Sequence, residues 1–274
     1  MIAHDPQLDP DPALAYRAVW ISDLHLGTRG CKAEFLLDFL QRTRCETLYL
    51  VGDVLDGWRL RKSPYWSRAQ SDVVQALLRK ARHGTRVLYV PGNHDESLRA
   101  YVGLSFGGVS VVSEAVHVTA DGKRLLVVHG DQFDGVVQYH RWLALLGDHA
   151  YRFVLAANHW FNVLRRKLGY DYWSLSAFLK HKVKNAVEFV YEFERSLVEE
   201  ARSRGYDGVV CGHIHKAELR EVDGVLYAND GDWVESCTAL VEHRDGRLEL
   251  LDWPLSAGLT TGELAPAPRA ALST

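Results

Sequence analysis

Residues 18–25 read AVWISDLH, a short apolar run that ends in a serine, an aspartate and a histidine. Its β-branched and aromatic residues are typical of a strand. Four further apolar runs have the same form, and each is followed directly by polar residues. They are residues 47–51 (TLYLV), 86–90 (RVLYV), 124–128 (RLLVV) and 207–211 (DGVVC). The repeated order predicts five core strands with polar residues where each strand stops.

Helical patterns separate the first three of these runs. Apolar residues recur at spacings of three and four over 33–41 and 68–82, as on the buried face of a helix. Strands that alternate with helices predict an α/β layered domain. Later the pattern changes to short strands with Asp-Gly dipeptides at 223–224 and 245–246, which favour tight hairpins. We expect these strands at 218–222, 225–228, 238–242 and 247–251.

A polar cluster follows each of the five core strands. Ligands gather at the carboxyl ends of strands in an α/β sheet, so the clusters meet at one edge if the strands are parallel neighbours. Glycines beside the clusters let the backbone turn sharply and approach a ligand closely. The clusters are Asp23-Leu-His25, Gly52-Asp53-Val-Leu-Asp56, Gly92-Asn93-His94-Asp95, His129-Gly-Asp131 and Gly212-His213-Ile-His215.

Seven side chains of these clusters form the predicted metal-ligand set: Asp23, His25, Asp53, Asn93, His129, His213 and His215. Four imidazoles, two carboxylates and one carboxamide exceed the needs of a single four-coordinate ion and suit two ions that share a carboxylate. Nitrogen and oxygen ligands without cysteine favour Mn²⁺, Fe or Zn²⁺. Two such ions lower the pKa of a water and direct it at phosphorus. In the competing interpretation the histidines cap strands and the other residues form loop turns.

The segment 133–204 interrupts the alternation, because its pattern is helical and rich in aromatic residues. Between residues 136 and 186 it has eight lysines and arginines and two acidic residues. A basic, aromatic helical insert on an otherwise acidic chain predicts a cap over a site or a surface for anionic lipid. The alternative is a helical subdomain whose aromatic residues form its own core and whose basic residues are solvated.

The composition is that of a soluble globular protein, with 274 residues, of which 47% are apolar and 24% charged. A net charge of −3 disfavours a general nucleic-acid binder. The sequence contains no run of 18 apolar residues, so we expect no transmembrane helix. The first twelve residues, MIAHDPQLDPDP, lack the parts of a signal peptide, and the four cysteines show no C-x-x-C spacing. We therefore expect a cytoplasmic protein with reduced thiols, a disordered start (1–15) and a flexible tail (256–274).

The ordered series D-x-H, G-D-x-x-D, G-N-H-D, H-G-D and G-H-x-H resembles the calcineurin-like metallophosphoesterase superfamily. The resemblance covers residues 19–215 and implies an αββα two-sheet sandwich over residues 16–255, with the helical segment 133–204 as a cap insert. It implies a first ion held by Asp23, His25, Asp53 and His215, and a second held by Asp53, Asn93, His129 and His213. In this assignment Asp53 bridges the two ions.

The resemblance also implies two catalytic residues outside the metal ligands. His94 matches the family's catalytic histidine, which helps the leaving oxygen depart. Asp56 matches the carboxylate that orients this histidine. A histidine beside two cations is pushed toward its neutral form by like charge, and a carboxylate such as Asp56 offsets this effect and selects the tautomer.

Within the superfamily, the chain looks like the UDP-2,3-diacylglucosamine pyrophosphatase-like group. The likeness rests on Ser22-Asp-Leu-His-Leu26, on the helical insert and on Asn229-Asp-Gly-Asp-Trp-Val-Glu235. Enzymes of this group use Mn²⁺ and cleave the pyrophosphate of a UDP-linked diacylated sugar, releasing UMP and a lipid A precursor. The likeness therefore implies two divalent ions, a lipid-linked anionic substrate, and peripheral contact with the cytoplasmic membrane face through the insert.

The chain departs from that group at His94, where the pyrophosphatases typically carry arginine. The exchange replaces a fixed phosphate clamp by a group that can act as an acid. Asn93 and His94 are predicted to contact the substrate, as are Lys180 and Lys184, which lie four residues apart in the insert.

Two other functions are open. One is a phosphodiesterase or phosphatase for soluble nucleotides or other phosphoesters, for which a basic aromatic cap has little use. The other is a non-catalytic scaffold of the same fold, which is disfavoured because every ligand position and the catalytic histidine are filled.

Overall fold

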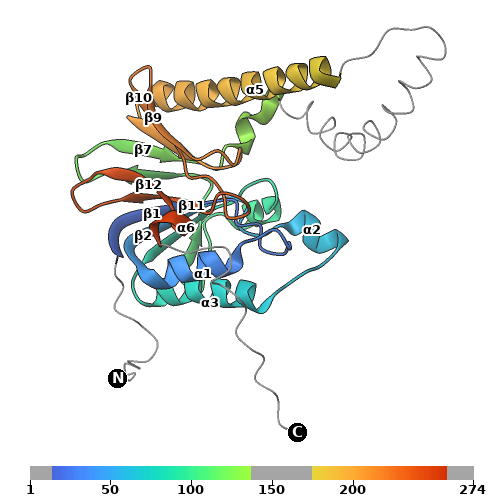
Figure 1. The fold of residues 1–274 in the computed structure, drawn as a ribbon. Coiled ribbons are helices and arrows are strands. Elements are labelled where there is room, and N and C mark those ends of the chain that lie inside the picture. The colour runs from blue at the N-terminus through green and yellow to red at the C-terminus, as the bar shows by residue number, and fades with distance from the viewer. Residues whose placement is uncertain (1–13, 137–174, 258–274) are drawn as a thin grey trace, which may run out of the picture. The chain divides into compact units, whose positions relative to one another are not determined.

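The computed structural model of the chain describes residues 14–136 and 175–257, and the fold is given for these residues (Figure 1). The chain divides into unit 1 (residues 1–131 and 198–274) and unit 2 (residues 132–197). Of the predicted start and tail, only residues 14–15 and 256–257 are described. The first two belong to strand β1, and Ser256 ends helix α6.

Unit 1 contains a seven-stranded sheet in the order β12-β11-β1-β2-β3-β5-β4. β1, β2, β3 and β5 run parallel to one another, whereas β4, β11 and β12 each pair antiparallel. The strands are β1 Leu14–Ile21, β2 Thr43–Val51, β3 Arg86–Val90, β4 Ser105–Phe106, β5 Val109–Val111, β11 Thr238–Glu242 and β12 Leu248–Asp252.

A second, five-stranded sheet has the order β6-β7-β8-β10-β9, with β7, β8 and β10 parallel. Its strands are β6 Ala115–Val118, β7 Arg124–Val127, β8 Gly208–Cys211, β9 Glu218–Val222 and β10 Val225–Asn229. The predicted Asp-Gly hairpin joins β9 to β10. Asp223 and Gly224 have φ of 49° and 80°, the left-handed values that a two-residue hairpin turn needs.

Helices cover the outer face of the seven-stranded sheet. Leu36 of α1 and Val73 of α3 are fully buried in one apolar cluster with Val19 and Ile21 of β1. The predicted periodicity of 33–41 and 68–82 therefore corresponds to real packing faces. Helical elements of unit 1 are α1 Ala33–Arg42, α2 Gly57–Lys62, α3 Arg68–Arg82, η1 Glu96–Tyr101 and α6 Trp253–Ser256.

The second core layer lies between the two sheets. Residues that alternate with Val19 and Ile21 along β1, namely Ala18 and Trp20, belong to this cluster, together with Leu125 of the second sheet. Trp20 stacks on Tyr49 with ring centroids 5.3 Å apart. β1 is thus buried on both faces, which explains why its sequence is apolar without polar alternation.

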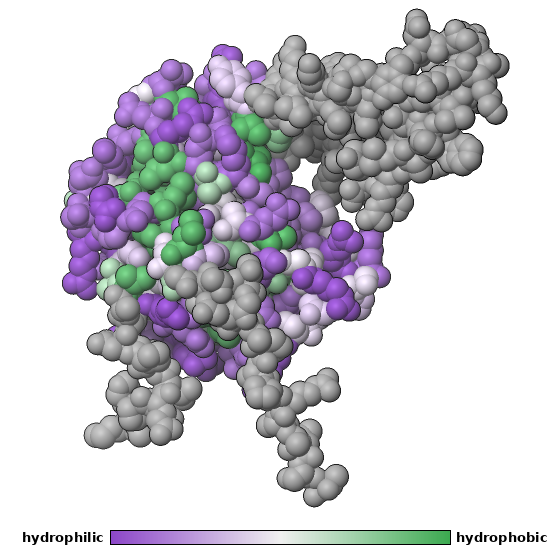
Figure 2. Space-filling view, viewed as in Figure 1, coloured by the Kyte–Doolittle hydropathy of each residue, from purple (hydrophilic) through white to green (hydrophobic). Residues whose placement is uncertain are grey.

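Near the amino end of β7, apolar side chains of both sheets line a cavity and are partly exposed to solvent. Figure 2 shows a hydrophobic patch in the region of β9 and β12, where Leu219, Leu226 and Leu248 line a cavity of about 450 Å³. Lys123, which precedes β7, also lines it. The cavity is therefore at the amino end of β7, whereas the predicted ligand His129 follows the carboxyl end.

The two remaining elements are η2, Asp131–Val136, and α5, Leu175–Ser203, which runs from unit 2 into unit 1. α5 agrees with the helical pattern predicted for the last part of 133–204. Residues 137–174, which include most of the predicted basic aromatic cap, lie outside the described residues.

The predicted two-sheet α/β sandwich is confirmed. The five core strands are divided between the two sheets, so the condition under which their polar clusters were expected to share one sheet edge is not met. β1, β2 and β3 are adjacent in the first sheet, and β7 and β8 are adjacent in the second. Apolar runs cannot reveal this division, because strands of either sheet bury both of their faces.

Candidate metal centre

The loops that follow the five core strands meet although the strands belong to two sheets. Asp23 and His25, after β1, lie beside His215, after β8. Asp53, after β2, lies beside His129, after β7, and His213, after β8. In each group one ligating atom from every residue lies within 4.8 Å of the others. The structure thus brings six of the seven predicted ligands into two compact groups.

The backbone of these loops is held in an unusual conformation. The left-handed φ values are 51° at Asp23, 47° at His25, 52° at Asp53, 73° at His213 and 54° at His215. Each such value costs a residue other than glycine on the order of 1–3 kcal/mol and persists only where the surroundings enforce it. Backbone hydrogen bonds supply the restraint, as from Asp23 N–H to Gly52 O and from His25 N–H to Asp53 O.

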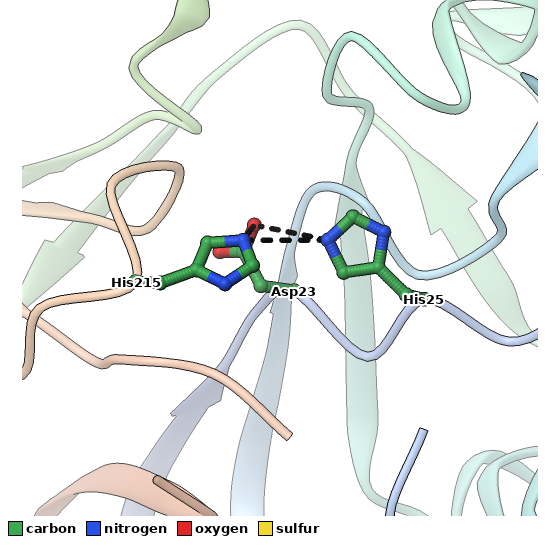
Figure 3. A group of neighbouring side chains, drawn as sticks. All are labelled: Asp23, His25 and His215. Atoms are coloured by element: carbon green, nitrogen blue, oxygen red, sulfur yellow. Dashed lines mark hydrogen bonds and ion pairs between the residues drawn. The ribbon is translucent and has the colours of Figure 1, made fainter. Parts of the chain in front are cut away.

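The first group consists of Asp23, His25 and His215 (Figure 3). Asp23 Oδ1 lies 3.0 Å from His215 Nε2 and 3.7 Å from His25 Nε2. The two imidazole nitrogens are 3.3 Å from each other. One carboxylate oxygen and two ring nitrogens therefore point at the same small volume, in which a divalent cation could be bound.

The second group consists of Asp53, His129 and His213. His129 Nδ1 lies 2.7 Å from the carbonyl oxygen of Val51. Because a carbonyl can only accept, Nδ1 carries the proton, and Nε2 can present its lone pair. This Nε2 lies 3.5 Å from Asp53 Oδ1. The arrangement is the usual one for a histidine that binds a metal through its other nitrogen.

Asp53 is common to both sides of the site. It groups with His129 and His213 on one side and with His25 and His94 on the other. The His94 backbone N–H donates to Asp53 Oδ1 at 2.8 Å. Gly92 gives the carboxylate room, because a Cβ at residue 92 would collide with Asp53 Oδ1 and His129. Asp53 therefore lies where a bridging ligand would be expected.

The buried carboxylates create a strongly negative environment. Burial alone lowers the pKa of His25, yet Asp23, Asp56 and Asp53 raise it to about 10. Burial likewise lowers the pKa of His129, but Asp53 outweighs this and raises the pKa to about 10. A field that strengthens the binding of a proton to these rings will also attract a divalent cation to them.

Three buried atoms of the predicted ligand residues have no hydrogen-bond partner. They are the buried Asp23 Oδ1, Asn93 Oδ1 and His129 Nε2. A buried polar atom without a partner costs roughly 1–3 kcal/mol, so such atoms rarely cluster without a reason. Their chemistry, two oxygens and one imidazole nitrogen, suits a cation. Asn93 stands in the chain between Gly92, whose Cα faces Asp53 Oδ1, and His94, whose backbone N–H donates to Asp53 Oδ1.

His94 lies at the edge of this centre. Its Nε2 is 3.9 Å from Asp53 Oδ2, and its Nδ1 is 3.2 Å from Asp56 Oδ1. Trp58 packs against the imidazole with ring centroids 4.0 Å apart. The ring of His94 is 23% exposed, more than that of His25 or His129, so it can reach both a ligand in the site and solvent.

Asp56 contacts two histidines and a helix. Besides His94, its carboxylate lies 3.4 Å from His25 Nδ1 and accepts a hydrogen bond from Arg59 N–H at 2.8 Å, which caps α2. Burial raises the pKa of Asp56, but His25 and His94 outweigh it, so the pKa lies well below its ordinary value. The contact with His25 was not predicted, since the motif relates Asp56 to His94 alone.

Comparison with known proteins agrees with this geometry. A family model described as calcineurin-like phosphoesterase matches residues 16–217. The chain belongs to the calcineurin-like phosphoesterase family. Members of this family are metal-dependent, and the match includes all seven predicted ligands.

Two bacterial enzymes illustrate the similarity to characterised proteins. A UDP-2,3-diacylglucosamine hydrolase of Xanthomonas campestris is 28% identical over 249 residues, which are 83% of this chain and 96% of the relative. One from Chromohalobacter salexigens is 31% identical over 140 residues, 47% of this chain and 52% of the relative. Among solved structures, a phosphoesterase from E. coli is 14% identical with a TM-score of 0.42, and the match covers 86% of this chain and 98% of that one.

In this phosphoesterase, Asp95 joins two of the ligand-bearing loops. It accepts hydrogen bonds from Val54 N–H at 2.8 Å and Gly92 N–H at 2.6 Å, and a short one from the Tyr89 hydroxyl. Burial raises the pKa of Asp95. By contrast, Asp131 pairs with the Arg99 guanidinium at 2.6 Å. Among the contacts described, neither acid is hydrogen-bonded to one of the candidate ligand imidazoles.

The predicted substrate contacts are only partly described. His94 lies at the edge of the centre and Asn93 precedes it in the chain, whereas Lys180 and Lys184 lie on α5 in a part whose side chains are outside the described residues. Over the described residues, no helix of the phosphoesterase is both long and apolar enough to cross a membrane. Sequence reasoning did not assign a role to Ser22 or Asp230, which lie directly behind Asp23.

Proposed function

We propose that this phosphoesterase is a dinuclear metal hydrolase that cleaves a pyrophosphate or phosphodiester bond in a UDP-linked diacylated glucosamine or a similar lipid-linked nucleotide. The proposal rests on two groups of acids and histidines that could each bind an ion. One consists of Asp23, His25 and His215, and the other of Asp53, His129 and His213. The name shared by the relatives supports the substrate class.

In this proposal each ion has four ligands. The first is held by Asp23, His25, Asp53 and His215, and the second by Asp53, Asn93, His129 and His213. The unpartnered buried atoms Asp23 Oδ1, Asn93 Oδ1 and His129 Nε2 support these roles. Nitrogen and oxygen ligands suit Mn²⁺, with Fe or Zn²⁺ as alternatives. When bound, such ions polarise the phosphate and make water a stronger nucleophile.

His94 and Asp56 would act beside the ions. His94 Nε2 faces Asp53 at 3.9 Å, close enough for this imidazole to donate a proton to a leaving oxygen held in the site. Asp56, 3.2 Å from Nδ1 of the same ring, would orient it. Trp58 limits the rotation of the ring by packing against it.

The basic aromatic segment 133–204 would serve as the cap that receives the lipid-linked part of the substrate. Its excess of lysine and arginine suits phosphate and anionic membrane surfaces, and Lys180 and Lys184 are the proposed phosphate contacts. Deleting the segment should spare the hydrolysis of small model substrates but abolish binding to anionic liposomes. Retained liposome binding would contradict this role.

One observation favours a second candidate. Histidine at position 94, where the pyrophosphatase-like group typically has arginine, supplies an acid in place of a phosphate clamp. An acid of this kind would help a phosphodiesterase or phosphatase that releases an alkoxide from a soluble nucleotide.

A substrate panel separates the candidates. Hydrolysis of UDP-diacylglucosamine would be measured beside plain UDP-sugars and a chromogenic phosphodiester, each with Mn²⁺, Mg²⁺ and Zn²⁺. The proposal expects the highest kcat/KM for the diacylated substrate with Mn²⁺. Equal rates on unacylated nucleotides would favour the second candidate, and no bound metal with no turnover would favour a scaffold.

A further inference from the structure

A buried serine and a second buried aspartate lie behind the proposed ligand Asp23. Ser22 Oγ is 2.6 Å from Asp23 Oδ2 and 2.5 Å from Asp230 Oδ1. Asp230 follows β10 directly, and all three side chains are essentially inaccessible to solvent. Two acids therefore share one hydroxyl group.

The number of protons constrains this arrangement. A serine hydroxyl has a single proton and can donate it to only one carboxylate at a time. If both acids were ionised, one of the two short oxygen contacts would contain no hydrogen. A proton on Asp230 resolves the conflict, because Asp230 then donates to Ser22 Oγ while Ser22 donates to Asp23 Oδ2.

The surroundings indicate which acid is neutral. Asp23 lies 3.0 Å from His215, whereas no lysine, arginine or histidine of the described residues is within ion-pair distance of Asp230. The second oxygen of Asp230, Oδ2, is buried without a hydrogen bond, which a neutral carboxyl group tolerates better than a carboxylate. Burial raises the pKa of Asp230 well above its ordinary value, in agreement with this assignment.

The donors behind Asp23 decide which of its oxygens faces the site. Oδ2 receives the Ser22 hydroxyl and the His213 backbone N–H at 2.8 Å. Oδ1 has no hydrogen bond and faces His25 and His215. Gly212 permits this packing, since a Cβ there would collide with Ser22 Oγ and Asp23 Oδ2.

We propose that Asp230 is a positioning residue: as a neutral carboxyl group it acts through Ser22 to hold Asp23 with Oδ1 turned toward the bound ion. The inference rests on the metal centre of the proposed function. It adds to that centre a buried, protonated aspartate that lies outside the five ligand motifs.

Mn²⁺ binding to metal-free protein, measured by titration calorimetry, tests this role. Asp230→Ala removes the donor to Ser22, and the affinity for Mn²⁺ should fall by about 10–100-fold, as when other outer contacts of metal ligands are lost. Asp230→Asn should bind Mn²⁺ nearly as well as wild type, because its Nδ2–H can donate to the same hydroxyl. A merely structural role would instead lower the Tm of metal-free Asp230→Ala and leave the affinity of the folded protein unchanged.

A double-mutant cycle checks that Asp230 acts through Ser22. Ser22→Ala should weaken Mn²⁺ binding, and adding Asp230→Ala should weaken it no further. Additive losses, or an Asp230→Asn variant as weak as Asp230→Ala, would overturn the inference. A wild type that binds no Mn²⁺ would overturn the proposed function itself. If Ser22→Ala does not fold, the Mn²⁺ affinities of Asp230→Ala and Asp230→Asn still test the positioning role of Asp230.

Discussion

Single residues at the centre have distinct environments, and their proposed roles differ accordingly. Asp53 is buried and lies between two groups of histidines, whereas His94 is partly exposed and lies beside Asp56 and Trp58. A ligand shared by two ions and an acid that only touches the substrate should respond differently to replacement. Two substitutions test this difference.

Replacing Asp53 should remove both ions at once. Asp53→Ala deletes the side chain that, among the described residues, groups with His25 and His94 on one side and with His129 and His213 on the other. Metal analysis of purified protein should therefore show a loss of both ions, whereas Asp72→Ala, on the exposed side of α3, should keep them. Two tightly held ions in Asp53→Ala would refute the bridging role.

Replacing His94 should leave the ions in place. His94→Ala is expected to lower kcat by about 10²–10⁴, the range typical of general acid–base help, with unchanged metal content. His83→Ala, at an exposed position, serves as the control. If metal content falls with activity, His94 is a ligand, in line with its grouping with His25 and Asp53.

At the scale of elements, α2 links the loop after β2 to His94, the proposed catalytic histidine. Asp56 caps α2 through Arg59 N–H and also contacts His25 and His94. The capping bond and the contacts with the rings use the same carboxylate. Helix stability and histidine orientation are therefore coupled at one residue.

Two substitutions of Asp56 should separate these effects. Asn retains the capping oxygen but not the charge, so Asp56→Asn should lower kcat with little change in Tm. Asp56→Ala should also lose the cap, at a cost of about 1 kcal/mol in the free energy of unfolding. Urea denaturation and kinetics on one set of variants measure both. Equal activity in Asp56→Asn and wild type would show that the charge is not needed.

For the whole of unit 1, a buried polar chain joins the two sheets away from the site. His117 of β6 lies 3.1 Å from the Tyr49 hydroxyl of β2 and 2.7 Å from Glu242 Oε2 of β11. The neutral ring satisfies both contacts, since Tyr49 donates to Nδ1 and Nε2–H donates to Glu242. Burial lowers the pKa of His117 below its ordinary value of 6.5, although Glu242 acts in the opposite direction.

The stability of the fold should therefore depend on pH through His117. Because the pKa is lower in the folded state, the contribution of His117 is complete above about 6.5 and is lost as the pH falls below it. Urea unfolding between pH 7.5 and 5 should show a steeper loss of stability in wild type than in His117→Gln. Parallel curves would mean that the ring does not titrate in this way.

Bound metal should also stabilise the whole fold. An ion that binds only the folded state adds about 2.7 kcal/mol when its concentration is a hundred times Kd. Thermal unfolding should therefore show a higher Tm with Mn²⁺ and a lower one with a chelator. Asp53→Ala should show neither shift. A wild-type Tm that changes with neither Mn²⁺ nor the chelator would count against a metal centre.

Much of the architecture follows from local patterns. The runs at 18–22, 47–51 and 86–90 and the helices at 33–41 and 68–82 agree with β1 to β3, α1 and α3 to within a few residues at their ends. Periodicity and apolar content are properties of the segment itself. The strands β4 to β6 and the short helical elements α2 and η1 were not predicted. The two or three residues of β4 and β5 are too few to show a period.

The amino-acid sequence by itself determined the family, the class of fold and the residues of the candidate site. Histidine, aspartate or asparagine followed each core strand at motif spacing, and no tertiary information was needed to select them. Only the tertiary structure decided that two different sheets supply these residues, that Asp56 contacts His25, and that Ser22 and Asp230 support Asp23 from behind. The physical reason is that such contacts join residues up to about two hundred positions apart, and a local pattern carries no information on which distant loops meet.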